Sequence, residues 1–235
     1  MTEPLAAVPV QEGDTPVRPT GYRLILPPGW VGIPLRKGTA EALEKLVFVH
    51  LKELPPDVPK DQGMKYRLAV RRDVEEQIAK ARAAGGLDLY LPIGPRYGTL
   101  LAASFLVTEV QVVDADGHIQ PDLVLERLSS GNGNGVATEV LELAGTTTVR
   151  REYVQPPAPD RAVHVPSRHI EYALPVPQDP MRYLAVSFST IGDGNPESDF
   201  TQALGELFDA VMTTFRWTSG PNGDTAVSQT ESRAQ

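Results

Sequence analysis

The most regular pattern of apolar and polar positions lies near the C-terminal end of the chain. Apolar side chains recur every three or four residues from Phe200 to Phe215, and the run reaches Trp217. This spacing gathers them on one face of an α-helix. Asn195 is a suitable N-cap, and Pro196 suits the first helical position. We therefore expect a helix over 196–217 that lies across a sheet.

Alternating positions predict two β-hairpins. The first pairs residues 138–143 with 146–154 around Ala144-Gly145, and the second pairs 167–176 with 182–191. Each strand of the second hairpin gathers apolar side chains on one face. Shorter apolar runs predict strands over 22–26, which 31–33 resume, and over 87–91 and 100–113. The sheet is therefore expected to be mostly antiparallel.

Two helices are expected between the first strands and the strand over 87–91. Thr39 is a suitable N-cap for the first, whose apolar positions continue to Leu54, before Pro55-Pro56. The second runs from about Lys60 to Ala84 and ends at two glycines. Its apolar stripe is interrupted by charged residues, so this helix is only weakly amphipathic.

The two ends of the chain differ in composition from the rest. Residues 1–20 are rich in Pro, Thr and Glu without periodicity, and residues 218–235 are polar. Neither segment buries enough apolar surface to offset the entropy of ordering. We expect two disordered tails around a single α+β domain over 21–217, in which helices flank a mostly antiparallel central sheet. A short helix is expected over 121–128.

Composition and charge exclude several kinds of site and disfavour several kinds of partner. The chain has 235 residues, no cysteine and a net charge of −8. Disulfides, thiolate metal sites and cysteine nucleophiles are therefore excluded, and an acidic surface disfavours nucleic acid and membrane partners. The N-terminus lacks the features of a signal peptide, and no stretch reaches the roughly 20 apolar residues of a membrane helix. We expect a cytoplasmic protein.

Motifs that carry chemistry are few and weak. Gly131–Gly135 lacks the third glycine of a dinucleotide-binding loop, and Asp114–His118 does not continue as an EF-hand. Residues 193–199 are rich in side-chain oxygens, which helix capping explains, with a weak divalent site as the alternative. The histidines lack metal-ligand spacing, and His50 is expected on an apolar helix face. The sequence identifies no catalytic, cofactor-binding or metal-ligating residue, and no cofactor is expected.

A family resemblance is carried by packing residues near the two ends of the domain. These are Leu26–Trp30, the hairpin strands Glu171–Pro177 and Leu184–Thr190, and Ala203–Ala210 with Thr214–Trp217. They resemble uncharacterised proteins of high-GC Gram-positive bacteria, which are similar in plan to the PsbP-like α/β/α sandwich. The resemblance implies that fold, in a family whose members mostly bind and assist other macromolecules and of which few are enzymes.

The segment from Lys60 to Arg82 is the best candidate for a docking surface. It carries seven basic and four acidic side chains in an acidic chain. A weakly amphipathic helix leaves much of its length exposed. We therefore predict that a protein partner docks at Arg67, Arg71 and Arg72. The alternative is a helix laced with its own salt bridges that touches nothing else.

These observations favour a non-enzymatic binding or accessory protein, such as a chaperone, an inhibitor or a secretion-associated factor. The alternative is a hydrolase or small-ligand-binding enzyme whose site assembles only in three dimensions. Acidic charge and the lack of a recognisable catalytic set or metal spacing favour the first. The sequence identifies neither the partner nor the biological process.

Overall fold

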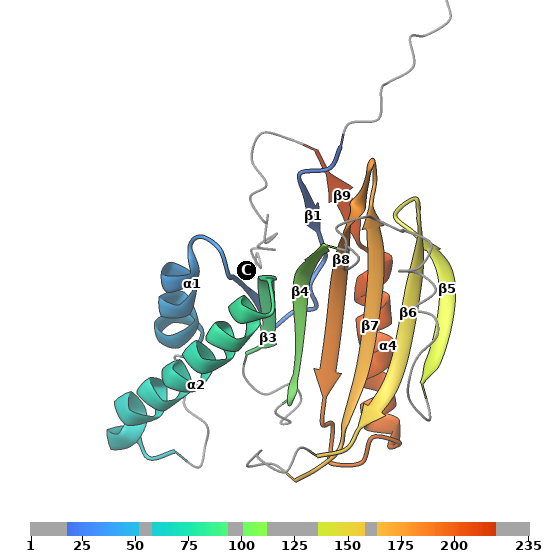
Figure 1. Cartoon of the computed structure of the whole chain (residues 1–235). Helices are drawn as coiled ribbons and strands as arrows, with labels where there is room; N and C mark the ends of the chain where they lie inside the picture. The colour runs from blue at the N-terminus through green and yellow to red at the C-terminus, as the bar shows by residue number, and fades with distance from the viewer. Residues whose placement is uncertain (1–17, 52–57, 94–100, 112–135, 158–163, 220–235) are drawn as a thin grey trace, which may run out of the picture.

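A seven-stranded antiparallel sheet forms the centre of the computed structural model, which describes residues 18–51, 58–93, 101–111, 136–157 and 164–219 (Figure 1). In order across the sheet, its strands are β2 (Trp30–Pro34), β3 (Gly86–Pro92), β4 (Ala103–Gln111), β8 (Asp179–Thr190), β7 (Ser167–Val176), β6 (Thr146–Gln155) and β5 (Ala137–Leu143). All neighbouring strands are antiparallel. With the helices on its faces, this sheet confirms the expected α+β fold class.

Both hairpins predicted from alternation are present. β5 and β6 join through Ala144 and Gly145, whose φ angles of 51° and 77° suit the type I′ turn of a two-residue hairpin. In the second hairpin, Ile170 of β7 lies opposite Phe188 of β8. Both side chains are buried on the same face of the sheet. The alternation therefore predicted the pairing as well as the strands.

Helix α4 (Asp199–Thr213) packs across that face of the sheet (Figure 1). Phe208, in the middle of the helix, is 3% exposed, and its ring stacks on Phe188 with a centroid distance of 4.9 Å. The rings of Phe105 and Tyr172 lie 5.7 and 5.8 Å from that of Phe208. The predicted helix across a sheet is confirmed.

Both ends of α4 differ from the prediction. Ser198 is the N-cap in place of Asn195, because the Ser198 hydroxyl accepts the N–H of Thr201 at 3.2 Å. At the other end the helix stops at Thr213. Residues Arg216–Thr218 then form strand β9, which pairs with β1 (Gly21–Arg23). Periodicity did not show this change, because the core residue Phe215, which precedes β9, continues the apolar stripe of α4.

A second group of helices lies against the opposite face, at the β2–β3 edge of the sheet (Figure 1). It consists of α1 (Thr39–Lys45), the π-helical turn η1 (Leu46–His50), the 3₁₀ turn η2 (Lys60–Gln62) and α2 (Gly63–Ala83). Val47 and Ile78 from these helices share a core with Ile33 of β2 and Leu89 of β3. The sheet therefore has helices on both faces.

The start and end of the first helix correct two expectations. Thr39 is the first residue of α1 and not its cap, and its hydroxyl donates to the carbonyl oxygen of Pro34 at 2.6 Å. His50, expected on the apolar face, is exposed. The chain widens into a π-turn after Lys45, which rotates the later side chains relative to an α-helix.

Residues 18–20, which the sequence analysis assigned to the N-terminal tail, lie against the domain. Arg18 forms an ion pair with Asp179, and the N–H of Thr20 donates to the carbonyl of Thr218 at 2.9 Å. The rest of that tail, residues 220–235 and the helix expected over 121–128 lie outside the described residues.

Candidate functional site

A cavity of about 540 Å³ lies between the small sheet β1–β9 and the large sheet. Its volume falls within the range of small-molecule sites. Its lining comes from both sheets and from the loop after β2: Pro19, Thr20, Gly21, Tyr22, Pro34, Arg36, Lys37, Leu87, Asp88, Glu109, Val176, Arg182, Leu184 and Trp217. Segments from both ends of the described chain, including β1 and β9, thus contribute to its wall.

The aromatic residues of the small sheet hold its position over the large sheet. Tyr22 of β1 stacks on Phe215 with a centroid distance of 5.7 Å, and Phe215 meets Trp217 edge to face at 5.0 Å. Phe215 belongs to the core beneath α4. The walls formed by Tyr22 and Trp217 are therefore anchored to the main core.

A buried carboxyl group lies in this cavity. Asp88 of β3 is 6% exposed, and its carboxylate accepts a hydrogen bond from the hydroxyl of Tyr22. Burial raises the pKa of Asp88, against the opposing effects of the Tyr22 hydrogen bond and the positive charge of Arg36. Burial, with Tyr90 and Asp88 nearby, raises the pKa of Tyr22 well above its ordinary value of 10. Tyr22 therefore remains a neutral hydroxyl.

Charged side chains form the rim of the cavity. Glu109 of β4 accepts a hydrogen bond from Arg36 at 2.7 Å, and Arg182 Nε lies 2.7 Å from its other oxygen in an ion pair outside hydrogen-bond geometry. The two guanidinium groups lower the pKa of Glu109, although its partial burial opposes this. Lys37 is exposed and has no ion pair among the described residues. The carboxylate of Glu109 is thus neutralised, and the ammonium group of Lys37 is not.

Trp217 adds a donor without an acceptor. Its Nε1 atom is buried and has no hydrogen-bond partner within the part of the chain that the structure describes. An unpaired buried N–H costs about 1–3 kcal/mol. Trp217 lines the cavity, but the N–H itself has almost no exposed surface.

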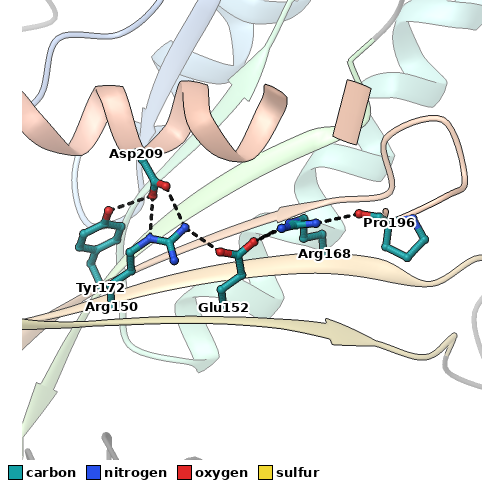
Figure 2. Close-up of polar contacts among 6 residues, drawn as sticks. All are labelled: Arg150, Glu152, Arg168, Tyr172, Pro196 and Asp209. Carbon is teal, nitrogen blue, oxygen red and sulfur yellow. Dashed lines mark hydrogen bonds and ion pairs between the residues drawn. The ribbon is translucent and has the colours of Figure 1, made fainter. Parts of the chain in front are cut away.

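A second polar cluster joins α4 to the sheet and is drawn in Figure 2. Arg150 of β6 donates two hydrogen bonds to Asp209 of α4, at 3.0 and 2.8 Å, and the hydroxyl of Tyr172 donates to the same carboxylate at 2.8 Å. Arg150 also pairs with Glu152, which pairs with Arg168.

The cluster continues from Arg168 to the chain that precedes α4, because its guanidinium donates to the carbonyl of Pro196 at 2.9 Å. Charges of opposite sign alternate along the whole row, and each is satisfied by its neighbours (Figure 2). Burial opposes ionisation of Glu152, but the positive charges and hydrogen bonds of Arg150 and Arg168 outweigh this effect. The pKa of Glu152 is therefore lowered. A saturated row of this kind stabilises the position of α4 and offers no vacant group to a ligand.

The three arginines predicted to bind a partner all lie on α2, each with a local contact. Arg71 donates to Glu75 at 2.9 Å, Arg72 lies 3.7 Å from Asp73, and Arg67 donates to the carbonyl of Leu51 at 3.1 Å. On the same helix, Met64 and Leu68 are 56% and 53% exposed. The structure thus shows salt bridges on an exposed helix, and docking at these residues stays a prediction.

The remaining sequence candidates do not form a site among the described residues. Asp193 accepts hydrogen bonds from the Ser198 hydroxyl at 2.8 Å and from the Asn195 N–H at 3.1 Å, so the oxygens of the 193–199 segment serve the start of α4. Residues 114–118 and 131–135 lie outside the described residues. Within the described ranges, no three His, Asp or Glu side chains are grouped to hold a metal. Likewise, none of the described helices is long and apolar enough to cross a membrane.

Sequence reasoning missed every polar residue of the cavity. Asp88 carried one signal, because it is the only charged residue of the predicted strand over 87–91 and all the other residues of that strand are apolar or aromatic. A charge inside a strand covered on both faces is unusual and points to a special role. Tyr22, Lys37 and Trp217 had no comparable signal.

Comparisons with known proteins do not assign the chain to a family. No protein-family model matches the chain, and no curated protein matches it. Among solved structures, the chain is similar to the crystal structure of LpqN, which is involved in cell envelope biogenesis of Mycobacterium tuberculosis. The two chains share 13% identity over 90% of each, with a TM-score of 0.46. A likeness of this size carries no argument, and the PsbP-like resemblance stays a prediction.

Proposed function

We propose that this chain is a non-enzymatic binding protein and that the cavity beside Asp88 binds a small ligand. The observation that supports this is a buried carboxyl group at the wall of a cavity with apolar surfaces. A buried ionisable group without a cation in direct contact reduces stability, so its retention favours a functional role. Its hydroxyl partner Tyr22 belongs to the small sheet that encloses the cavity.

Binding is favoured over catalysis by the state of the ionisable groups around the cavity. Tyr22 would have to ionise to act as a nucleophile, and its raised pKa opposes this. Glu109 is held by two guanidinium groups, which reduce its basicity. These groups are suited to recognising a ligand by charge and hydrogen bonding.

A neutral apolar fluorophore, N-phenyl-1-naphthylamine, tests whether the cavity binds ligands. We expect saturable binding with one site per chain, seen as an increase in fluorescence. Leu87 lines the cavity and is half-buried, so Leu87→Trp should place a bulkier side chain in the binding space and weaken binding. Thermal melting of the variant should show that it remains folded.

Leu68→Gln is the matched control, because Leu68 is an exposed apolar residue of α2 that does not line the cavity. Binding should persist in this variant. Loss of binding in Leu68→Gln together with retention in Leu87→Trp would assign the probe to the surface of α2 and would overturn the proposal. Turnover in a broad hydrolase screen that disappears in Asp88→Asn would instead favour the enzyme alternative, in which Asp88 acts as a general acid or base.

A second candidate function is docking of an acidic protein partner on α2. It is favoured by exposed Met64 and Leu68 lying on a helix that also carries Arg67, Arg71 and Arg72. Poly-L-glutamate serves as the probe. We expect salt-sensitive binding that is lost when the three arginines are changed together to glutamate and is unchanged in Lys37→Gln. Equal binding by the arginine variant would contradict this candidate.

A further inference from the structure

The geometry points to an organic anion with an apolar body as the ligand of the cavity, its anionic group at Lys37 and Arg36 and its body against Leu184 and Trp217. This inference rests on the proposed binding function and specifies the chemistry of that site. It follows from the charges of the rim and the apolar walls.

The charges that line the cavity favour an anion. Three cations line it, Arg36, Lys37 and Arg182, against the two carboxyl groups of Asp88 and Glu109. Glu109 is already paired with both arginines. Lys37 has no counter-ion among the described residues and is exposed, so a ligand anion meets an unpaired ammonium group there. This positive rim stands out on a chain of net charge −8.

The walls of the cavity suit an apolar body. They include Leu87, Val176, Leu184 and the rings of Tyr22 and Trp217. Burial of apolar ligand surface against them is favourable. A purely polar anion, such as inorganic phosphate, would leave these walls without contacts. The ligand is therefore amphipathic.

Neither carboxyl group of the cavity reverses this preference for an anion. The carboxyl group of Asp88 is buried and already accepts a hydrogen bond from the hydroxyl of Tyr22. A cationic ligand would find the more accessible carboxylate, Glu109, already occupied by two guanidinium groups.

Three compounds that share a ten-carbon chain and differ in head group test the inference: decanoate, decan-1-ol and decylamine. Each is titrated against the complex with N-phenyl-1-naphthylamine at low ionic strength, below the micelle concentrations of decanoate and decylamine and below the solubility limit of decan-1-ol. We expect decanoate to displace the probe at about threefold to fivefold lower concentration than decan-1-ol, the size of one partly screened charge interaction. Decylamine should be weakest.

Lys37→Gln should remove the preference for decanoate over decan-1-ol. Lys45→Gln, which changes an exposed lysine of α1 outside the cavity lining, should leave that preference unchanged.

The outcomes separate the two proposals. Displacement by all three compounds at equal concentration, or best by decylamine, would overturn the anion inference while the binding function stands. Failure of the fluorophore itself to bind in the cavity would overturn the proposed function. A preference for decanoate that survives Lys37→Gln would show that the anion does not lie at the assigned rim.

Discussion

Replacing Arg150 with methionine would remove the central cation of the row that fixes α4 to the sheet. The guanidinium is bonded to Asp209 through two hydrogen bonds and to Glu152 through an ion pair at 2.8 Å. Its side chain is 14% exposed. Methionine keeps the stem of the side chain and its packing, so the change removes mainly the charge and its hydrogen bonds.

The size of the effect follows from what the two carboxylates retain. Removing one partner of a fully buried ion pair costs about 3–5 kcal/mol. Here Asp209 is 34% exposed and keeps the hydroxyl of Tyr172, and Glu152 keeps Arg168. We therefore expect a loss of about 2–3 kcal/mol in the free energy of unfolding. For a domain of this size, that corresponds to a decrease of roughly 5–10 °C in Tm.

Urea unfolding and thermal melting measure this loss, and Arg151→Met is the matched control. Arg151 is the next residue of β6 and lies on the opposite face, with an Nε atom that has no hydrogen-bond partner among the described residues. It should not lower the stability, because the change removes a buried donor that has no partner. An Arg150→Met variant as stable as the wild type, or a larger loss in Arg151→Met, would refute the assignment of the row as the clamp of α4.

The same comparison has a pH dependence. The fold lowers the pKa of Glu152 below its ordinary value of 4.5. A lowered folded-state pKa contributes stability that is present above pH 4.5 and is lost as the pH falls through the folded-state value. Because Arg150 is one of the two cations that lower it, the difference between wild type and Arg150→Met should shrink below pH 4.5. A difference that grows on acidification would contradict this account.

Two further predictions concern Asp88 and Phe208. The raised pKa of Asp88 means that its contribution to stability is present below about pH 3.8 and is lost as the pH rises through the folded-state pKa. Asp88→Asn should therefore increase stability by about 0.5–2 kcal/mol near pH 7 and not at pH 3, as measured by urea unfolding; a destabilised variant at pH 7 would contradict this. Phe208→Asp should place an unpaired charge in the core and lower the free energy of unfolding by more than about 4 kcal/mol, as measured by urea unfolding. Leu207 is partly exposed on the same helix, so Leu207→Asp should cost far less.

The sequence alone determined those elements whose signal is local. The stripe that contains Phe208 predicted α4 and the face it buries, and the alternation that contains Ile170 predicted the hairpin of β7 and β8. The glycine after α2 has a φ angle of 79°, as its role as a helix stop requires. These features follow from the spacing of neighbouring side chains, which fixes their direction once a helix or strand forms.

The tertiary structure alone decided the sites. Tyr22 and Asp88 are 66 residues apart in the sequence, and Arg150 and Asp209 are 59 apart. No periodicity relates such residues, because strand order and the position of α4 over the sheet are set by the burial of the whole core. Trp217 shows the same principle: its apolar character continues the stripe of α4, but pairing with β1 places it in a strand and so at the wall of the cavity. Local pattern specifies which way a side chain points, and the packing of distant segments specifies what it meets.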